Sequence, residues 1–237
     1  MVMVTPPDNT SVIASGHWTT RACITVRCYF IIGCLLLMSV AVLSIRVSRL
    51  YILRSAGQMI VMQQSGIKSA DVIVVAIDAG GAGTLEAADL VHNGVANRVA
   101  VFDDPPSSVD REFLRRGLPY DDRGATAARQ LHLLGIENIE PIPRATTGSE
   151  QEGEILPGWC EEHGYHTAVL VTSSDHSRRL NRILRRSMHG DELRVIVRGS
   201  RYSKFNPDSW WKSRDEVRDG IFEFQKLILD LVQHPLS

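Results

Sequence analysis

The feature that most constrains this chain is a run of eighteen residues without a charge, from Cys28 to Ile45, between Arg27 and Arg46. A helix of that length rises 1.5 Å per residue and spans roughly 27 Å, close to the hydrocarbon thickness of a bilayer. The rest of the sequence has the composition of a soluble domain. We therefore predict one transmembrane helix that tethers one globular domain.

A cleaved signal peptide and a buried core helix are the alternative interpretations of this run. A signal peptide has a shorter apolar region and a small-residue cleavage site soon after it. Here Arg46-Val47-Ser48-Arg49 follows the run, and a long polar or mixed stretch precedes it. We expect residues 1–27 to form a disordered tail, residues 28–53 an uncleaved anchor with a juxtamembrane helix, and residues 70–237 the domain.

Arginines flank the predicted anchor on both sides. Arg21 and Arg27 precede it, and Arg46, Arg49 and Arg54 follow it. Positive-inside counting favours a cytoplasmic domain. The difference is one arginine, so the side of the membrane stays open.

Composition excludes several classes of protein. The net charge is −1, which gives no indication of a nucleic-acid partner. Three of the four cysteines lie in or beside the anchor, so Cys160 alone lies in the domain. An intradomain disulfide is impossible there, and the sequence suggests no metal site.

Short apolar runs alternate with segments of helical periodicity after residue 70. Because such alternation is typical of parallel sheets, we predict an α/β, Rossmann-like three-layer domain with a mostly parallel sheet. Ligands of such sheets bind outside the carboxyl ends of the strands. The predicted strands are 71–77, 98–102, 138–142, 167–172 and 193–197, and the predicted helices are 85–93, 121–134, 149–163 (broken or kinked at Pro157), 176–188 and 209–233.

One segment of the sequence carries most of the candidate chemistry. Polar residues follow the buried strand 167–172 and lead into a helix, where free backbone N–H groups attract anions. We predict that His176 acts as acid or base, that Arg179 holds an anion, and that Thr172 and Ser173 orient it. The alternative is an ordinary helix cap with a surface histidine and solvated arginines.

Two further segments are candidates for the same site. Thr147, Ser149 and Glu150 also lie between a strand and a helix and are predicted to face the same cleft as His176, with Glu150 as a second catalytic group. A simple capping box from Ser149 to Glu152 is the alternative. Gly80 and Gly81 follow the first strand and permit close approach of a ligand to the backbone, although a tight turn explains them equally well.

The helix 176–188 is strongly basic, and two tryptophans precede the last helix. The arginines have the charge to meet anionic lipid headgroups, but a solvated face balanced by nearby acids is the simpler interpretation. Trp210 and Trp211 are expected to pack in the core at the start of the last helix, with a pocket or the membrane interface as alternatives. The arginines are Arg178, Arg179, Arg182, Arg185 and Arg186.

Three short motifs resemble the SanA/ElyC/YdcF family, a bacterial group built on a domain of unassigned function. Val171-Thr172-Ser173-x-x-His176-x-x-Arg179 is similar to its V-T-S-x-x-H-x-x-R-A signature. The Thr/Ser-rich stretch before Glu150 is similar to its S-x-x-T-x-E-N segment. Glu223-x-x-Lys226-Leu227, preceded by a tryptophan, is similar to its E-x-x-K-L ending. The chain departs from the family at Asp78-Ala79-Gly80-Gly81 and at Asp103-Asp104-Pro105-Pro106, where the family has L-G-G and S-G-G.

The resemblance implies an N-terminal membrane segment, a Rossmann-like domain and a role in cell-envelope integrity or peptidoglycan precursor metabolism. Three functions remain open. The first is a membrane-anchored protein that binds or acts on an anionic small molecule or lipid-linked precursor. The second is a catalytically degenerate binding or regulatory module for a membrane partner. The third is an S-adenosylmethionine-binding enzyme, which the resemblance alone suggests. The expected partners are the lipid bilayer and the anionic small molecule or lipid-linked precursor.

Overall fold

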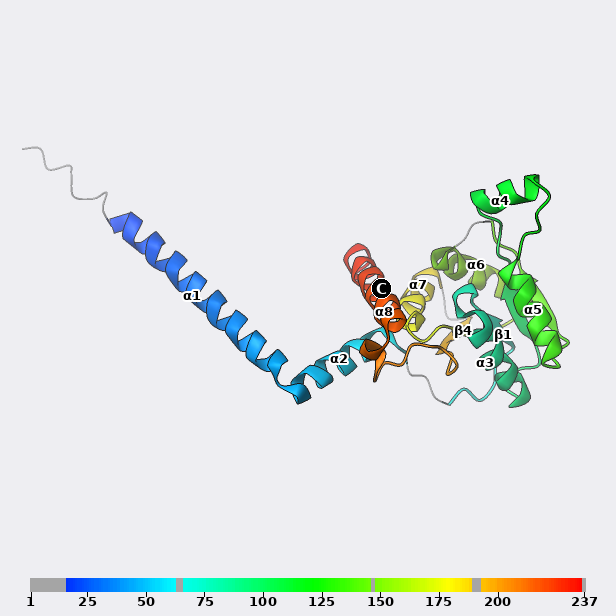
Figure 1. Ribbon diagram of the computed structural model, residues 1–237. Coiled ribbons are helices and arrows are strands. Elements are labelled where there is room, and N and C mark those ends of the chain that lie inside the picture. The colour runs from blue at the N-terminus through cyan, green and yellow to red at the C-terminus, as the bar shows by residue number, and fades with distance from the viewer. Residues whose placement is uncertain (1–15, 63–65, 146–147, 189–192, 236–237) are drawn as a thin grey trace, which may run out of the picture. The chain divides into compact units, whose positions relative to one another are not determined.

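The computed structural model describes residues 16–62, 66–145, 148–188 and 193–235. The chain divides into two compact units, Met1–Ile52 and Leu53–Ser237. The elements, in chain order, are α1 (Gly16–Ser44), α2 (Arg46–Ile60), β1 (Val72–Val75), η1 (Ile77–Ala79), α3 (Gly80–His92), β2 (Val99–Phe102), α4 (Ser108–Arg115), α5 (Arg123–Leu133), β3 (Ile139–Ile142), α6 (Ser149–Glu162), β4 (Thr167–Thr172), α7 (Ser177–Ser187), β5 (Arg194–Gly199), η2 (Trp210–Lys212) and α8 (Arg214–Gln233) (Figure 1).

The first unit consists of α1 and the first half of α2. Helix α1 begins at Gly16, so residues 16–27 are helical rather than part of the expected tail. No proline or glycine interrupts this stretch until Gly33, which lets the helix extend back toward the N-terminus. Within the described residues no single helix has the length and apolar character to cross a bilayer, although Tyr29–Ala41 and Arg46–Ile60 together meet that test as a bent pair.

The second unit is an α/β domain around a five-stranded sheet in the order β3-β2-β1-β4-β5. Every neighbouring pair is parallel. The prediction of an α/β domain with a parallel sheet is confirmed. The strand order reverses between β1 and β4, where the chain crosses from one half of the sheet to the other, and ligands of such sheets bind at this reversal.

Side chains of the central strands pack alternately on the two faces of the sheet. In β1, Ile73 and Val75 face the helices α3 and α5, whereas Val72 and Val74 face α6 and α7. All four of these side chains are buried. Burial on both faces explains why the strands read as continuous apolar runs.

A third apolar cluster joins the end of α2 to the C-terminal part of the domain. Ile60, Trp210 and Leu227 are its buried centre, and the indole Nε1 of Trp210 donates a hydrogen bond to the Leu53 carbonyl at 2.8 Å. The core position predicted for Trp210 is therefore confirmed. Because of this cluster the domain begins at Leu53, earlier than the boundary expected at residue 70.

Three local features differ from the sequence prediction. Helix α3 begins at Gly80 rather than near residue 85, helix α4 was not expected, and α6 continues through Pro157 without a break. Pro157 lacks only its own N–H, and the buried contacts of Leu156 and Trp159 on either side hold the helix in place. Polar side chains gather at the carboxyl ends of β1 and β4.

Candidate functional site

Asp78 connects the two loops that follow β1 and β4. Its carboxylate accepts hydrogen bonds from the Thr172 hydroxyl at 2.8 Å, from the Ser173 backbone N–H at 3.0 Å and from the Ser173 hydroxyl at 2.7 Å. Two predicted site residues, Thr172 and Ser173, are thus fixed against the loop that carries Gly80 and Gly81. Both hydroxyls already donate hydrogen bonds to Asp78, so a ligand that contacts them would contact the Asp78 carboxylate as well.

The N-terminus of α3 follows directly and carries no side-chain cap. Gly80 adopts φ +48°, a conformation that glycine reaches without strain, and both Gly80 and Gly81 are exposed. Uncapped N–H groups at a helix start attract anions. Rossmann-like domains bind phosphates at this position, but the Gly80 N–H already donates to the Ile77 carbonyl, so an anion here would depend on the N–H groups from Gly81 onward.

His176 is enclosed at the start of α7. Its Nδ1 lies 3.0 Å from Oε2 of Glu223 and 3.0 Å from a terminal nitrogen of Arg179. A protonated Nδ1 donates to Glu223, and an unprotonated one accepts from Arg179. The imidazole is 3% exposed, and its Nε2 has no hydrogen-bond partner among the described residues. The ring is thus oriented through Nδ1, and Nε2 is the nitrogen left for a further hydrogen bond.

Arg179 has an anionic partner within the protein. Its Nε donates to the same Glu223 oxygen at 3.0 Å, and the other Glu223 oxygen lies 2.6 Å from Nζ of Lys226. Burial alone raises the pKa of the Glu223 carboxyl, but His176, Arg179 and Lys226 together bring it well below its ordinary range. Arg179 therefore positions Glu223 and His176 in this structure, and a ligand anion would have to compete with Glu223 for it.

Glu152, not Glu150, enters this region from α6. Its Oε1 accepts a hydrogen bond from Arg144 at 3.0 Å and lies 3.4 Å from the backbone nitrogen of Ile77. Burial, and then the negative charge of Asp78, raise the pKa of Glu152 to about 7. A carboxyl with that pKa exchanges a proton near neutral pH, which suits acid–base chemistry.

The other residues predicted from the second segment lie elsewhere. Glu150 is exposed, and its carboxylate contacts Arg186 at 3.2 Å. Ser149 does not form the expected capping box, because Gly148 is the N-cap of α6 and no side chain caps that helix. Thr147 lies outside the described residues.

Acids balance the arginines of α7, as predicted, but the face is not solvated, because the side chains of Arg179, Arg182 and Arg186 are only 13 to 18% exposed. Arg182 and Arg186 both contact Asp230 of α8, at 2.5 and 2.6 Å. Arg178 donates to the Val61 carbonyl at 3.1 Å. These contacts fasten α7 to α8 and to the end of α2.

A cavity of about 570 Å³ lies beside Asp78. Gly81 and Ser173 line it on one side, and the loop after β5 and the start of α8 close the other. Its walls carry more carboxylates than cations. Lys204 is the only basic residue among the lining residues, and the acidic ones are Asp78, Asp175, Glu216 and Asp219. Burial raises the pKa of Asp175. Such walls suit hydroxyl or amino groups of a ligand, while its anionic end would face α3.

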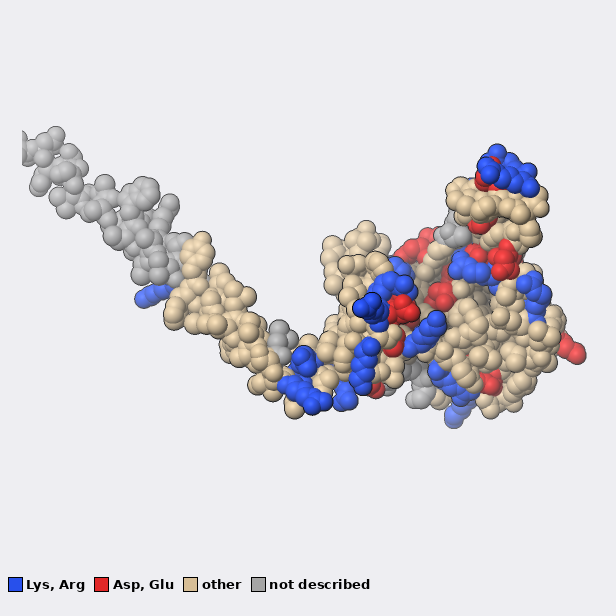
Figure 2. Space-filling view, viewed as in Figure 1, with Lys and Arg blue, Asp and Glu red and all other residues tan. Residues whose placement is uncertain are grey.

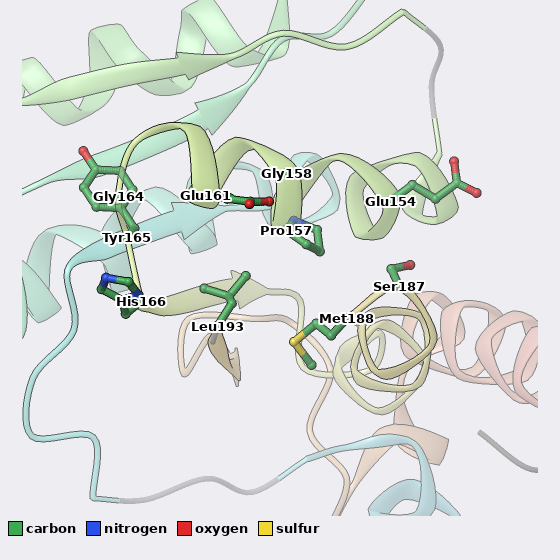
Figure 3. A pocket seen from close by; sticks show the side chains of 10 residues that line it. All are labelled: Glu154, Pro157, Gly158, Glu161, Gly164, Tyr165, His166, Ser187, Met188 and Leu193. Atoms are coloured by element: carbon green, nitrogen blue, oxygen red, sulfur yellow. The ribbon is translucent and has the colours of Figure 1, made fainter. Parts of the chain in front are cut away.

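Another hollow, of about 380 Å³, lies at the opposite edge of the sheet (Figure 3). Tyr165 and His166 before β4 and Leu193 before β5 line it, together with Pro157 of α6 and Met188 after α7. It is remote from the carboxyl ends of the strands, where ligands of parallel sheets bind. We therefore place the candidate site at the cavity beside Asp78.

Sequence reasoning missed Asp78, Arg144 and Glu152 as site residues. A signal for Glu152 was present, because it is in helical phase with the buried residues Leu156 and Trp159. Among the described residues no cluster of histidine, cysteine, aspartate or glutamate side chains fits a metal ion. Comparisons of the chain with protein-family models and with curated proteins give no match.

Proposed function

We propose that this chain is a membrane-tethered protein that binds an anionic small molecule or lipid-linked precursor at the carboxyl edge between β1 and β4 and acts on it by acid–base chemistry. Cell-envelope or peptidoglycan biogenesis is the process that we propose for it, on the resemblance to the SanA/ElyC/YdcF family. The observation that carries the chemical proposal is the buried imidazole of His176, with Nδ1 beside Glu223 and Nε2 unpartnered within the described chain.

The tether is supported by the apolar surface of α1. Nine of its large apolar side chains are each more than half exposed among the described residues of the first unit. Water is a poor solvent for such a surface, whereas the hydrocarbon core of a bilayer accommodates it. These side chains are Tyr29, Phe30, Ile31, Ile32, Leu35, Leu36, Leu37, Met38 and Val40.

The ligand class is supported by the two parts of the site. The start of α3 has no side-chain cap, so the N–H groups from Gly81 onward can serve a phosphate or carboxylate, whereas the Gly80 N–H already donates to the Ile77 carbonyl. The cavity beside it offers carboxylates, which accept hydrogen bonds from hydroxyl groups. A phosphorylated sugar or a nucleotide-linked sugar has both kinds of group in one molecule.

Binding without turnover is the second candidate function. The specific observation in its favour is that Nε2 of His176 is fully covered and that His176 does not line the cavity beside Asp78. Turnover would then require the surrounding loops to move. A regulatory module that reports ligand binding to a membrane partner would not need that movement.

The anion site can be tested with one exposed glycine. The nearest atom to a Cβ at Gly81 is the Gln130 Oε1 at 3.9 Å, so both alanine and aspartate fit there. A carboxylate at this position is favourable for the helix but repels an anion. We expect uridine-diphosphate sugars or a polyprenyl phosphate to raise the Tm of the detergent-solubilised full chain and of Gly81→Ala, but not of Gly81→Asp.

The outcomes separate the functions. A ligand that stabilises all three proteins equally would place its anionic group elsewhere and contradict the proposed site. S-adenosylmethionine is included in the panel, and stabilisation by it alone would support the third function. Turnover of the stabilising ligand by the wild-type chain and its loss in His176→Gln, with binding retained, would separate an enzyme from a binding module.

A further inference from the structure

Helix α8 has one buried face and one uncovered apolar face. Gly220, Glu223, Leu227 and Asp230 point into the domain. On the other side five large apolar side chains are 44 to 73% exposed and, at 3.6 residues per turn, fall on an arc of about 120°. We call these five residues the outer face of α8; they are Ile221, Phe222, Ile228, Leu229 and Val232.

The outer face carries little charge of either sign. Between Gly220 and Pro235 the only carboxylates are Glu223 and Asp230, and both are buried and paired with basic side chains. The exposed Lys226 lies at the edge of the face. In Figure 2 the end of α8 nearest the C-terminus is tan on its visible surface. The exposed Gln225, which is uncharged, lies within the same arc. An apolar patch of this kind on a folded domain marks a surface that binds a partner or a membrane.

The position of the tether indicates which partner. The second unit begins at Leu53, whose carbonyl accepts the hydrogen bond from Trp210, and the same apolar cluster contains Phe224 and Leu227 of α8. The chain therefore enters the domain at a cluster that α8 helps to form. The residues from Ile45 to Ile52 separate α1 from that cluster, and those from Arg46 to Ile52 make about 10 Å of helix. The covalent connection between a bilayer that holds α1 and the cluster is therefore short.

We propose that the outer face of α8 lies on the bilayer that holds α1, with its apolar side chains at the boundary between headgroups and acyl chains. The inference rests on the tether proposed above, and it adds a second membrane contact made by the folded domain itself. Helices that present one apolar face bind membranes in this way, parallel to the surface and with that face at the boundary between headgroups and acyl chains. The same helix carries Glu223 on its buried face, so the contact would orient the element that positions His176.

The test uses the full chain in vesicles. Cys23, Cys28 and Cys34 are replaced by alanine, whereas Cys160 is left, because it is buried and burial raises its pKa to about 12. An environment-sensitive fluorophore is attached at Ile228→Cys or Val232→Cys and, as a control, at Leu133→Cys. Leu133 is 88% exposed and lies on α5, away from α8 (Figure 1).

The proteins are reconstituted into phosphatidylcholine–phosphatidylglycerol vesicles with or without nitroxide-labelled lipid. We expect the nitroxide to quench the label at 228 and 232 several-fold more strongly than the label at 133. Adding Leu229→Glu to the protein labelled at 232 should reduce quenching to the control level, whereas Leu85→Glu, an exposed position on α3, should leave it unchanged.

Each contrary result has a distinct meaning. A chain that floats with the vesicles but shows equal quenching at 228, 232 and 133 overturns the contact of α8 and leaves the tether standing. A chain that does not float overturns the tether, and the α8 proposal with it. Oxidative cross-linking between the 228 positions of two chains, without lipid quenching, would assign the outer face to a second copy instead.

Discussion

His176 and Glu223 come from segments 47 residues apart and meet with Nδ1 3.0 Å from Oε2. Both side chains are buried, and Arg179 donates to the same oxygen at 3.0 Å. Since the carboxylate is shared among His176, Arg179 and Lys226, its negative charge holds three groups of the domain in place. The loss of that charge should therefore lower the free energy of unfolding as well as affect any reaction at the site.

Glu223→Gln should destabilise the domain by about 3 kcal/mol at pH 7, because it leaves Arg179 buried without a counter-charge. The folded-state pKa of Glu223 is lowered, so its contribution is present above the ordinary pKa and is lost as pH falls toward the folded one. Urea unfolding of the detergent-solubilised chain, followed by tryptophan fluorescence, should show the difference from wild type shrinking below about pH 4.5.

The exposed glutamate Glu161 of α6 supplies the control for this experiment. Glu161→Gln should change the free energy of unfolding by less than about 0.5 kcal/mol at any pH. If Glu223→Gln lowers the free energy of unfolding equally at pH 3 and pH 7, the shape of the Glu223 side chain rather than its charge stabilises this part of the domain.

Asp78→Ala should loosen the connection between the loops after β1 and β4. It removes the acceptor of the Thr172 hydroxyl and of the Ser173 N–H, which should cost about 1–2 kcal/mol. Hydrogen exchange should accelerate in the peptide that contains Ser173. Asp215→Ala, at an exposed aspartate in the first turn of α8, should leave that exchange unchanged and cost less than about 1 kcal/mol, the contribution of a carboxylate at a helix start. Unchanged exchange at Ser173 in Asp78→Ala would contradict the connecting role.

The strands β1, β2 and β4 could be predicted from sequence because they are buried on both faces. The start of α3 could not, since glycines 80, 81 and 83 favour a loop by propensity. A Cβ at Gly83 would lie 2.3 Å from the Ala79 Cβ and 3.0 Å from Val75 Cγ1, so close packing on β1 requires glycine there. Helix α4 contains no buried residue and is held by the local capping box of Ser107 and Asp110, which leaves no core pattern to detect.

The candidate site was predictable to a similar extent. Thr172, Ser173 and His176 stood out because polar residues follow a strand that is buried from its second residue to its end. The partners of His176 depend on which face of α8 turns inward, and that is decided by packing against α7. The choice of Glu152 over Glu150 likewise depends on the phase of α6, which the contact of Gly153 with Ile183 fixes in three dimensions.

Two glycines of α6 offer a matched test of that packing. A Cβ at Gly153 would lie 2.5 Å from Ile183 Cγ2 of α7, whereas one at Gly158 meets nothing within 4 Å. Gly153→Ala should destabilise the domain by about 1–3 kcal/mol through overpacking. Gly158→Ala should stabilise it by about 0.5–1 kcal/mol, since alanine favours the helix. Equal effects of the two substitutions on urea unfolding would contradict the close approach of α6 to α7.

Glu152→Gln should stabilise the domain at alkaline pH, the reverse of Glu223→Gln. Burial, together with the charge of Asp78, raises the pKa of Glu152 to about 7, so the folded protein binds a proton there that the unfolded chain has already released. The wild type therefore loses stability as pH rises from about 4.5 to about 7, by about 2–4 kcal/mol in total, whereas the neutral glutamine does not. Arg144 keeps Asp104 as a counter-charge in the variant, because its NH2 lies 3.3 Å from the Asp104 carboxylate.

Unfolding curves of the wild type and of Glu152→Gln from pH 4 to pH 8 should show the two proteins converging at low pH and the variant more stable at pH 8. A variant that is less stable than wild type at pH 8 would show that the ion pair between Arg144 and Glu152 outweighs the burial of the carboxylate, and that Glu152 is charged at neutral pH rather than ready to exchange a proton.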